Sequence, residues 1–306
     1  MYLKYDMKLW IKIVLGLLAA LIIVVGGYIV THSGYRIDRN NLPQFIQADF
    51  VDLSKIYSIS KFRSGEGHDF SGGGETCRSM KHYFTPQYDP TAKFILDAEG
   101  KGLPPKPDGK TDIPIYAPVD GRIISISEEH TPIGKQISIR PDHASQFTIR
   151  LFHIYPVDGI KALSSVKAGQ QIGVIGKNQG TDLAVQIGGL PWNQNFVSYF
   201  EVMPDSLFAA YQARGATSRS DFIITKEYRD AHPFVCGGDM NEMFQHPQNY
   251  DRSADDVHLS GYTAPNYGQS GPGLENGSGA QNRGGNTNQS TSAQPQSGAS
   301  TIQNQN

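Results

Sequence analysis

Ile115-Tyr-Ala-Pro-Val-Asp-Gly121 opens a stretch of short β-type runs that decides the fold of this chain. The stretch continues through Ile149-Arg-Leu-Phe-His-Ile154 and Val166-Lys-Ala-Gly-Gln-Gln-Ile-Gly-Val-Ile-Gly176, and it closes with Gly180-Thr-Asp-Leu-Ala-Val-Gln-Ile187. Short runs rich in Ile and Val, bounded by Gly, Pro or Asp, are typical of β-strands. We therefore expect a mainly β domain.

The strand pattern extends over much of the middle of the chain. It covers residues 122–127, 136–140, 147–152, 171–175 and 182–187. Helical patterns are few, and residues 204–214 read as one short amphipathic helix that Asp205 or Ser206 can cap. Successive short strands with few helices between them predict a mainly antiparallel sheet.

An uncharged apolar run at residues 13–30 predicts a membrane helix. At about 1.5 Å per residue, this run and the apolar residues 9–11 ahead of it can cross a hydrocarbon core about 30 Å thick. Lys4, Lys8 and Lys12 precede the run, and positive flanking residues favour the cytoplasmic side. A secretory signal peptide is the alternative, but no clear small-residue cleavage site follows the run.

These features predict the organisation of the chain. From about residue 261 the sequence is dominated by Gly, Asn, Gln and Ser, which cannot bury enough apolar surface to fold. We expect a cytoplasmic N-terminus (1–12), a transmembrane anchor (13–30), a juxtamembrane linker (31–60), a β-domain (61–242) and a disordered tail (243–306). The β-domain would lie outside the cytoplasm, held at the cell membrane by a single span.

Net charge and cysteine content narrow the possible partners and the possible kinds of metal site. A net charge of −2 gives no argument for a nucleic-acid partner. The two cysteines, Cys77 and Cys236, exclude a four-cysteine zinc site. Outside the cytoplasm they can form a disulfide, and two unrelated buried thiols are the alternative.

The stretch from 113 to 187 resembles the M23 (lysostaphin-like) metallopeptidase family, and weaker similarity covers about residues 62–202. The resemblance implies an antiparallel β-sheet or sandwich of the duplicated hybrid motif type. It also implies one zinc ion, held by a His-x-x-x-Asp motif and by the second histidine of a His-x-His motif. The first histidine of that pair and another strand histidine would act on the attacking water and the tetrahedral intermediate.

The residues at these motif positions depart from the family pattern. His153 stands at the place of the catalytic strand histidine, and Asp69 at the place of the metal-binding aspartate. Gly65, Asp182 and Ala184 stand where three further histidines are expected, and alanine cannot bind a metal. Aligning Phe200-Glu201-Val202 with the residues that follow the His-x-His motif of the family does not restore those histidines either.

The alternative to a lost metal site is a rearranged one, built from other side chains. His68 and His82 are further candidate ligands, and they could join the others only if the fold brought them together. The group would then consist of His68, Asp69, His82, His153 and Asp182.

Taken together, the residues predict a degenerate member of the family, a pseudoenzyme that needs no cofactor. It would serve as a binding or scaffolding module of the cell envelope, with a peptide, glycan or protein partner. The main rival is an active zinc metallopeptidase acting on envelope peptides or peptidoglycan through the rearranged site. A phosphocarrier-like domain of the broader fold is a third possibility, and an extracytoplasmic location argues against it.

Overall fold

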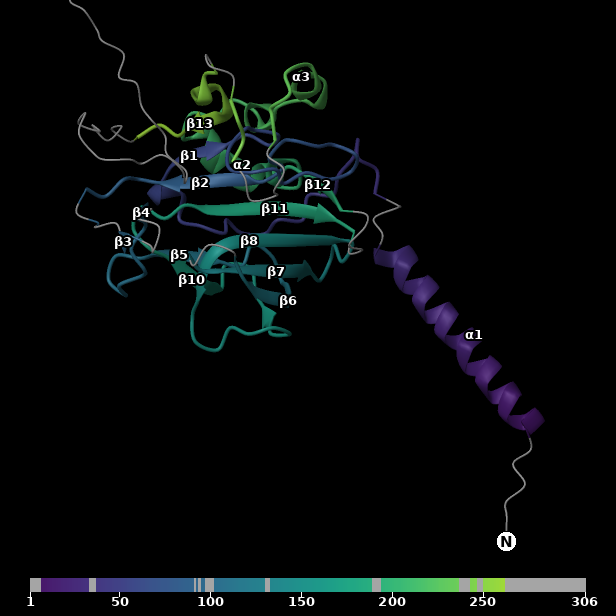
Figure 1. Ribbon diagram of the computed structural model, residues 1–306. Helices are drawn as coiled ribbons and strands as arrows, with labels where there is room; N and C mark the ends of the chain where they lie inside the picture. Colours follow the sequence, from purple (N-terminus) through teal and green to yellow (C-terminus); the bar gives the residue numbers. More distant parts are fainter. Residues whose placement is uncertain are drawn as a thin grey trace, which may run out of the picture.

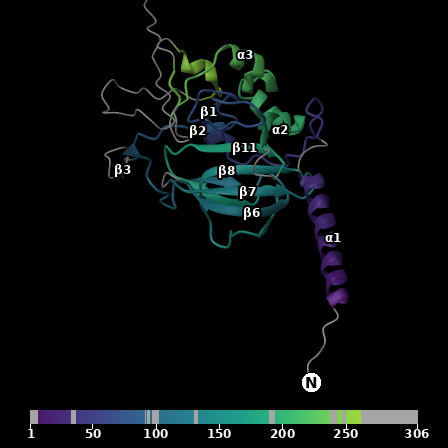
Figure 2. The ribbon, with the colours of Figure 1, turned by 45° about the vertical axis from the view of Figure 1, so that its right-hand side comes forward.

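The computed structural model of the chain describes residues 7–32, 37–90, 92, 95–96, 102–129, 133–188, 194–236, 243–246 and 250–261. This part is mainly antiparallel β-sheet, preceded by one long apolar helix, α1 (Met7–His32). Figures 1 and 2 show α1 running away from the β-domain. Residues 1–6 of the predicted N-terminal segment and 262–306 of the predicted tail lie outside the described residues.

Helix α1 is the helix, among the residues described, that is long and apolar enough to cross a membrane. The apolar segment covers Lys8–Ile29, has a mean hydropathy of 2.6, and buries none of its residues against the domain. This segment contains the run predicted from sequence up to residue 29.

A large antiparallel sheet forms the body of the domain (Figure 1). In spatial order its main path runs through β13 (Asp256–His258), β1 (Ile56–Ser60), β2 (His82–Pro86), β11 (Thr181–Ile187), β8 (Phe147–Pro156), β7 (Lys135–Pro141), β6 (Gly121–Glu128) and β9 (Ser165–Val166). Strand β10 (Gln171–Ile175) pairs with β8 and with β5 (Ile113–Tyr116), and β12 (Asn195–Val197) pairs with β11. The five strands predicted from sequence correspond to β6, β7, β8, β10 and β11.

Smaller elements lie around the sheet. Strands β3 (Ile95–Leu96) and β4 (Gly102–Leu103) form a separate two-stranded sheet. Helix α2 (Asp205–Gln212) lies within the predicted helix 204–214, and α3 (Lys226–Ala231) follows it. The Thr225 side chain caps α3 by accepting from the backbone N–H of Tyr228.

The two faces of the sheet carry different side chains because successive strand residues point to opposite faces. On β11, Leu183, Val185 and Ile187 join the main hydrophobic core. Ala184 lies on the other face, in a smaller cluster that also contains Phe62, Met80, Phe152 and Phe196. We call the face that carries Asp182, Ala184 and Gln186 the outer face, and the candidate site lies on it.

The folded part is longer at both ends than the predicted domain 61–242. At the N-terminal end, Ile46, Phe50 and Val51 are buried in the main core, so the predicted linker 31–60 is partly core. At the C-terminal end, β13 pairs with β1 and Leu259 is buried in the same core. The predicted boundaries are corrected accordingly, because pairing between distant segments carries these residues into the sheet.

Candidate functional site

Asp182 is the centre of the candidate site and is almost completely enclosed by protein. It lies on the outer face of β11, and only 2% of its side chain is exposed. An ionised carboxylate at such a position needs a cationic partner, because burial without one costs several kcal/mol or more. Its partner is Lys81, whose Nζ lies 2.8 Å from Asp182 Oδ2 and whose side chain is 3% exposed.

Strand alternation explains why Lys81 reaches Asp182. Lys81 immediately precedes β2, the strand that pairs with β11, and the register sets Tyr83 of β2 opposite Asp182. Residues 81 and 83 therefore share the outer face, whereas His82 and Phe84 point toward the opposite side. Phe84 is part of the main core, as this alternation requires.

His153 completes the site from β8. Its Nε2 lies 3.3 Å from Asp182 Oδ2, and its Nδ1 lies 2.6 Å from Glu129 Oε2. Glu129 also accepts a hydrogen bond from the backbone N–H of His153 at 2.6 Å. One histidine thus joins the two carboxylates, and its side chain is 21% exposed.

A local irregularity in β8 turns His153 toward this face. His153 has a φ of 64°, in the left-handed region that residues other than glycine rarely adopt. The pairing of β7 with β8 shifts register between Lys135 and Ile137, as in a β-bulge. Leu151 and Ile154 both remain in the main core, so Phe152 and His153 both occupy the outer side of the strand.

Aromatic rings surround the Lys81 ammonium. Nζ lies 4.7 Å from the ring centroids of Tyr83 and Phe152, and 5.1 Å from that of Phe70. Distances below about 6 Å allow cation–π attraction. Arg150, the next outer-face residue on β8, lies over Phe70 and Phe152 at 5.0 and 5.4 Å.

The electrostatics hold Lys81, Asp182 and His153 in their ionised forms. Burial alone would favour the neutral forms of Lys81 and Asp182, but their mutual attraction outweighs it. The pKa of Lys81 is therefore raised, and the pKa of Asp182 is held well below its usual range. Burial also opposes the charge on His153, yet Asp182 and Glu129 together raise the pKa of His153 to about 9.

The pKa values of two histidines are shifted in opposite directions, and these shifts predict how the free energy of unfolding depends on pH. Because the folded pKa of His153 is about 9, above its ordinary 6.5, its contribution is complete below pH 6.5 and lost as the pH rises through 9. Burial lowers the pKa of His82 to about 4, so its contribution is complete above pH 6.5 and lost as the pH falls through 4. We expect the free energy of unfolding to be highest near pH 6.5, from these two groups. Each arm should amount to on the order of 3 kcal/mol.

Urea unfolding between pH 4 and 10 measures both arms of that profile (pKa about 4 and about 9). The His153→Gln variant should flatten the alkaline arm and leave the acid arm unchanged. An alkaline arm of equal size in His153→Gln would show that another group causes it.

His82, predicted as a candidate metal ligand, lies on the wrong side of β2. Its Nδ1 is 2.8 Å from the backbone oxygen of Ser60, and its Nε2 is 2.8 Å from Ser198 Oγ. Its ring packs edge-on against Phe200 in the core. His82 is a buried structural histidine, because a one-residue step along a strand changes the face.

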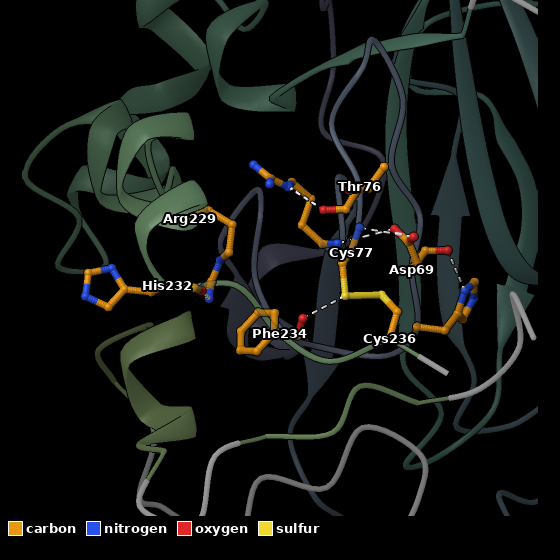
Figure 3. The surroundings of a disulfide bond; sticks show 9 residues. Asp69, Thr76, Cys77, Arg229, His232, Phe234 and Cys236 are labelled. Carbon is orange, nitrogen blue, oxygen red and sulfur yellow. Dashed lines mark hydrogen bonds between the residues drawn. A yellow bond between two sulfur atoms is a disulfide. The ribbon is translucent and has the colours of Figure 1, made fainter. Parts of the chain in front are cut away.

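Asp69, predicted as the metal-binding aspartate, caps a loop instead. Its carboxylate accepts hydrogen bonds from the backbone N–H groups of Cys77 at 3.1 Å and Arg78 at 3.3 Å. Figure 3 shows Asp69 beside Cys77, which is joined to Cys236 by a disulfide. Asp69 therefore positions the loop that carries the disulfide.

The remaining predicted positions do not rebuild a ligand set. A Cβ at Gly65 would lie 2.5 Å from the Phe234 ring and 2.8 Å from His246 Nε2, so a histidine has no room there. Ala184 is 1% exposed and covered by the smaller aromatic cluster. His68 is half-buried near the site, and burial, followed by the charge of Lys81, lowers its pKa.

The residues present do not fit the zinc ion that the family resemblance implies. Zinc requires three or more ligands, with oxygen and nitrogen about 2.0–2.2 Å from the metal. The part of the chain that is described contains no group of three or more His, Cys, Asp or Glu side chains able to hold a metal ion. The Lys81 ammonium already contacts the carboxylate oxygen that faces His153.

Sequence reasoning found two members of this cluster and missed two. It places His153 in the site, and it treats Asp182 as the replacement of a lost histidine or as a possible metal ligand, but not as the partner of a buried cation. Lys81 and Glu129 were not considered. Asp182 is the one charged residue of the predicted strand 182–187, which indicates a cationic partner, but the chain has 27 Lys and Arg residues to choose from.

Searches of protein-family models and of curated proteins found no match to this chain. Among solved structures it is similar to Helicobacter pylori Csd3 in an orthorhombic crystal, with 18% identity and a TM-score of 0.30, over 55% of this chain and 41% of that one. The hexagonal crystal of Csd3 gives 17% identity and a TM-score of 0.28, over 56% and 40% of the two chains. Lysostaphin in solution gives 16% identity and a TM-score of 0.23, over 44% of this chain and 51% of that one. The chain spans about half the length of lysostaphin and less than half that of Csd3.

Proposed function

We propose that this chain is a membrane-anchored, non-catalytic binding or scaffolding module of the cell envelope, with an M23-like domain whose metal site is degenerate. The proposal rests on one observation: the side chains at the positions that catalysis would need are already paired with other side chains of the same chain. Asp182 and His153 are bound to Lys81 and Glu129, and the position of Ala184 is closed by aromatic side chains. The Asp182 carboxylate is buried and already paired with Lys81, so it is not free to hold a metal ion with an open position for water or for a polarised substrate oxygen.

The location proposed for the domain is extracytoplasmic. The apolar helix α1 supports an anchor, and the three lysines before and within it support a cytoplasmic N-terminus. The disulfide between Cys77 and Cys236 supports an oxidising compartment for the domain.

A binding role is supported by what the outer face presents beside the closed site. Arg150 donates to the side-chain oxygens of Gln136 at 3.1 Å and Gln186 at 3.5 Å, and the described residues give it no carboxylate partner. A half-buried guanidinium with neutral partners retains donors that suit an anionic group. An envelope peptide, glycan or protein that carries carboxylates is complementary to this surface.

The test is a peptidoglycan and peptide cleavage assay on the full-length chain in detergent. We expect no cleavage above background, with or without added zinc, and no difference between wild type and His153→Ala. Cleavage that is abolished both by a chelator and by His153→Ala would establish the rival reading, an active metallopeptidase with a rearranged site.

A further inference from the structure

The surroundings of Lys81 have the composition of a recognition site for an organic ammonium ion. The rings of Phe70, Tyr83 and Phe152 lie 5.1, 4.7 and 4.7 Å from Nζ, and the Asp182 carboxylate lies 2.8 Å away. Aromatic rings combined with a carboxylate are the groups that bind alkylammonium ligands in proteins. Here the cation is the end of a side chain of the same molecule.

The charges of the cluster balance only when Lys81 is included. Asp182 and Glu129 carry the negative charges, and Lys81 and His153 carry the positive ones. Arg150 lies over two of the same rings, but its hydrogen bonds go to Gln136 and Gln186. Without the lysine, the enclosed group would hold one uncompensated negative charge beside an aromatic cavity.

We propose that the outer face contains a cation-binding site of the alkylammonium type, and that Lys81 is its permanent, tethered occupant. The inference rests on the proposed function, because it takes the site to be closed to metal. It goes further in assigning the ligand class that the site recognises. Lys81 is then a replacement for a ligand rather than an incidental ion-pair partner.

The test replaces Lys81 by alanine and supplies an alkylammonium ion as a separate small molecule. Lys81→Ala deletes the three methylenes beyond Cβ and the ammonium, which together correspond to n-propylammonium. We expect Lys81→Ala to unfold at a lower temperature than wild type, and n-propylammonium to restore most of the loss in a saturable way. n-Propanol, of similar length but neutral at pH 7, should give little recovery because it cannot balance Asp182.

Controls separate site binding from general salt effects. Wild type and Lys81→Met should not respond to n-propylammonium, because a side chain still fills the cavity. If Lys81→Ala folds poorly, refolding yield in the presence of each compound gives the same comparison. Equal effects of n-propylammonium and n-propanol, or no saturable effect, would overturn the inference even if the wild type proves free of zinc and inactive. Zinc-dependent cleavage by the wild type would instead overturn the proposed function.

Discussion

Replacing Asp182 by asparagine is expected to lower the free energy of unfolding by about 3–5 kcal/mol, the usual cost of removing one partner from a buried ion pair. The substitution keeps nearly the same volume, so packing is little changed. It leaves the Lys81 ammonium, 3% exposed, without its carboxylate, and it deprives His153 of one of its two partners. Urea unfolding of the full-length chain at pH 7 measures the loss.

Two further variants show that the loss comes from a buried charge. Glu128→Gln breaks the exposed pair between Glu128 and Lys135, whose side chains are 77% and 42% exposed, and it should cost about 0–1 kcal/mol. The double variant Lys81→Met/Asp182→Leu removes both charges and should recover most of the stability lost in Asp182→Asn. A loss in Asp182→Asn no larger than in Glu128→Gln would mean that water reaches the pair.

The Cys77→Ser/Cys236→Ser double variant is the second change with a large expected effect. The disulfide joins residues separated by 159 positions, so it closes most of the domain into one loop. The loop-entropy model gives about 5 kcal/mol for a loop of that size, and measured losses in small domains are about 2–5 kcal/mol. We expect a loss in that range, seen as a lower urea midpoint.

Reducing the disulfide between Cys77 and Cys236 in the wild type measures its contribution to stability independently. A reducing agent should lower the urea midpoint of the wild type to that of the double variant, and it should not change the double variant. A wild type that is insensitive to reduction and unfolds at the midpoint of the double variant would show that the bond does not form in the purified protein.

The positions of individual strands could be predicted from the sequence, but the pairing of strands that are far apart in the chain could not. Strands β6, β7, β8, β10 and β11 lie where short runs rich in Ile and Val, bounded by turn residues, predict them. Strand β13 is three residues long and pairs with β1, roughly 200 positions earlier in the chain. A short strand with a distant partner leaves little local pattern, so the C-terminal boundary was placed too early.

The site was partly predictable for a similar reason. The resemblance to the M23 family singles out the positions of His153, Asp182 and Ala184, and the unsuitability of alanine as a ligand follows from its chemistry. The role of Lys81 depends on the register of β2 against β11, which sets Tyr83 opposite Asp182 and turns His82 to the other side. The orientation of His153 depends on a left-handed residue at an irregularity in β8. Neither feature has a signature in a single sequence.

The zinc content of the full-length wild type tests the central claim most directly. The chain, purified in detergent without a histidine tag or chelator, is dialysed against excess zinc, then against buffer, and measured by elemental analysis. A site already filled by the Lys81 ammonium predicts zinc at background level, unchanged in His68→Ala, His82→Ala and His153→Ala. One zinc ion per chain, lost on changing any of these histidines, would contradict the account.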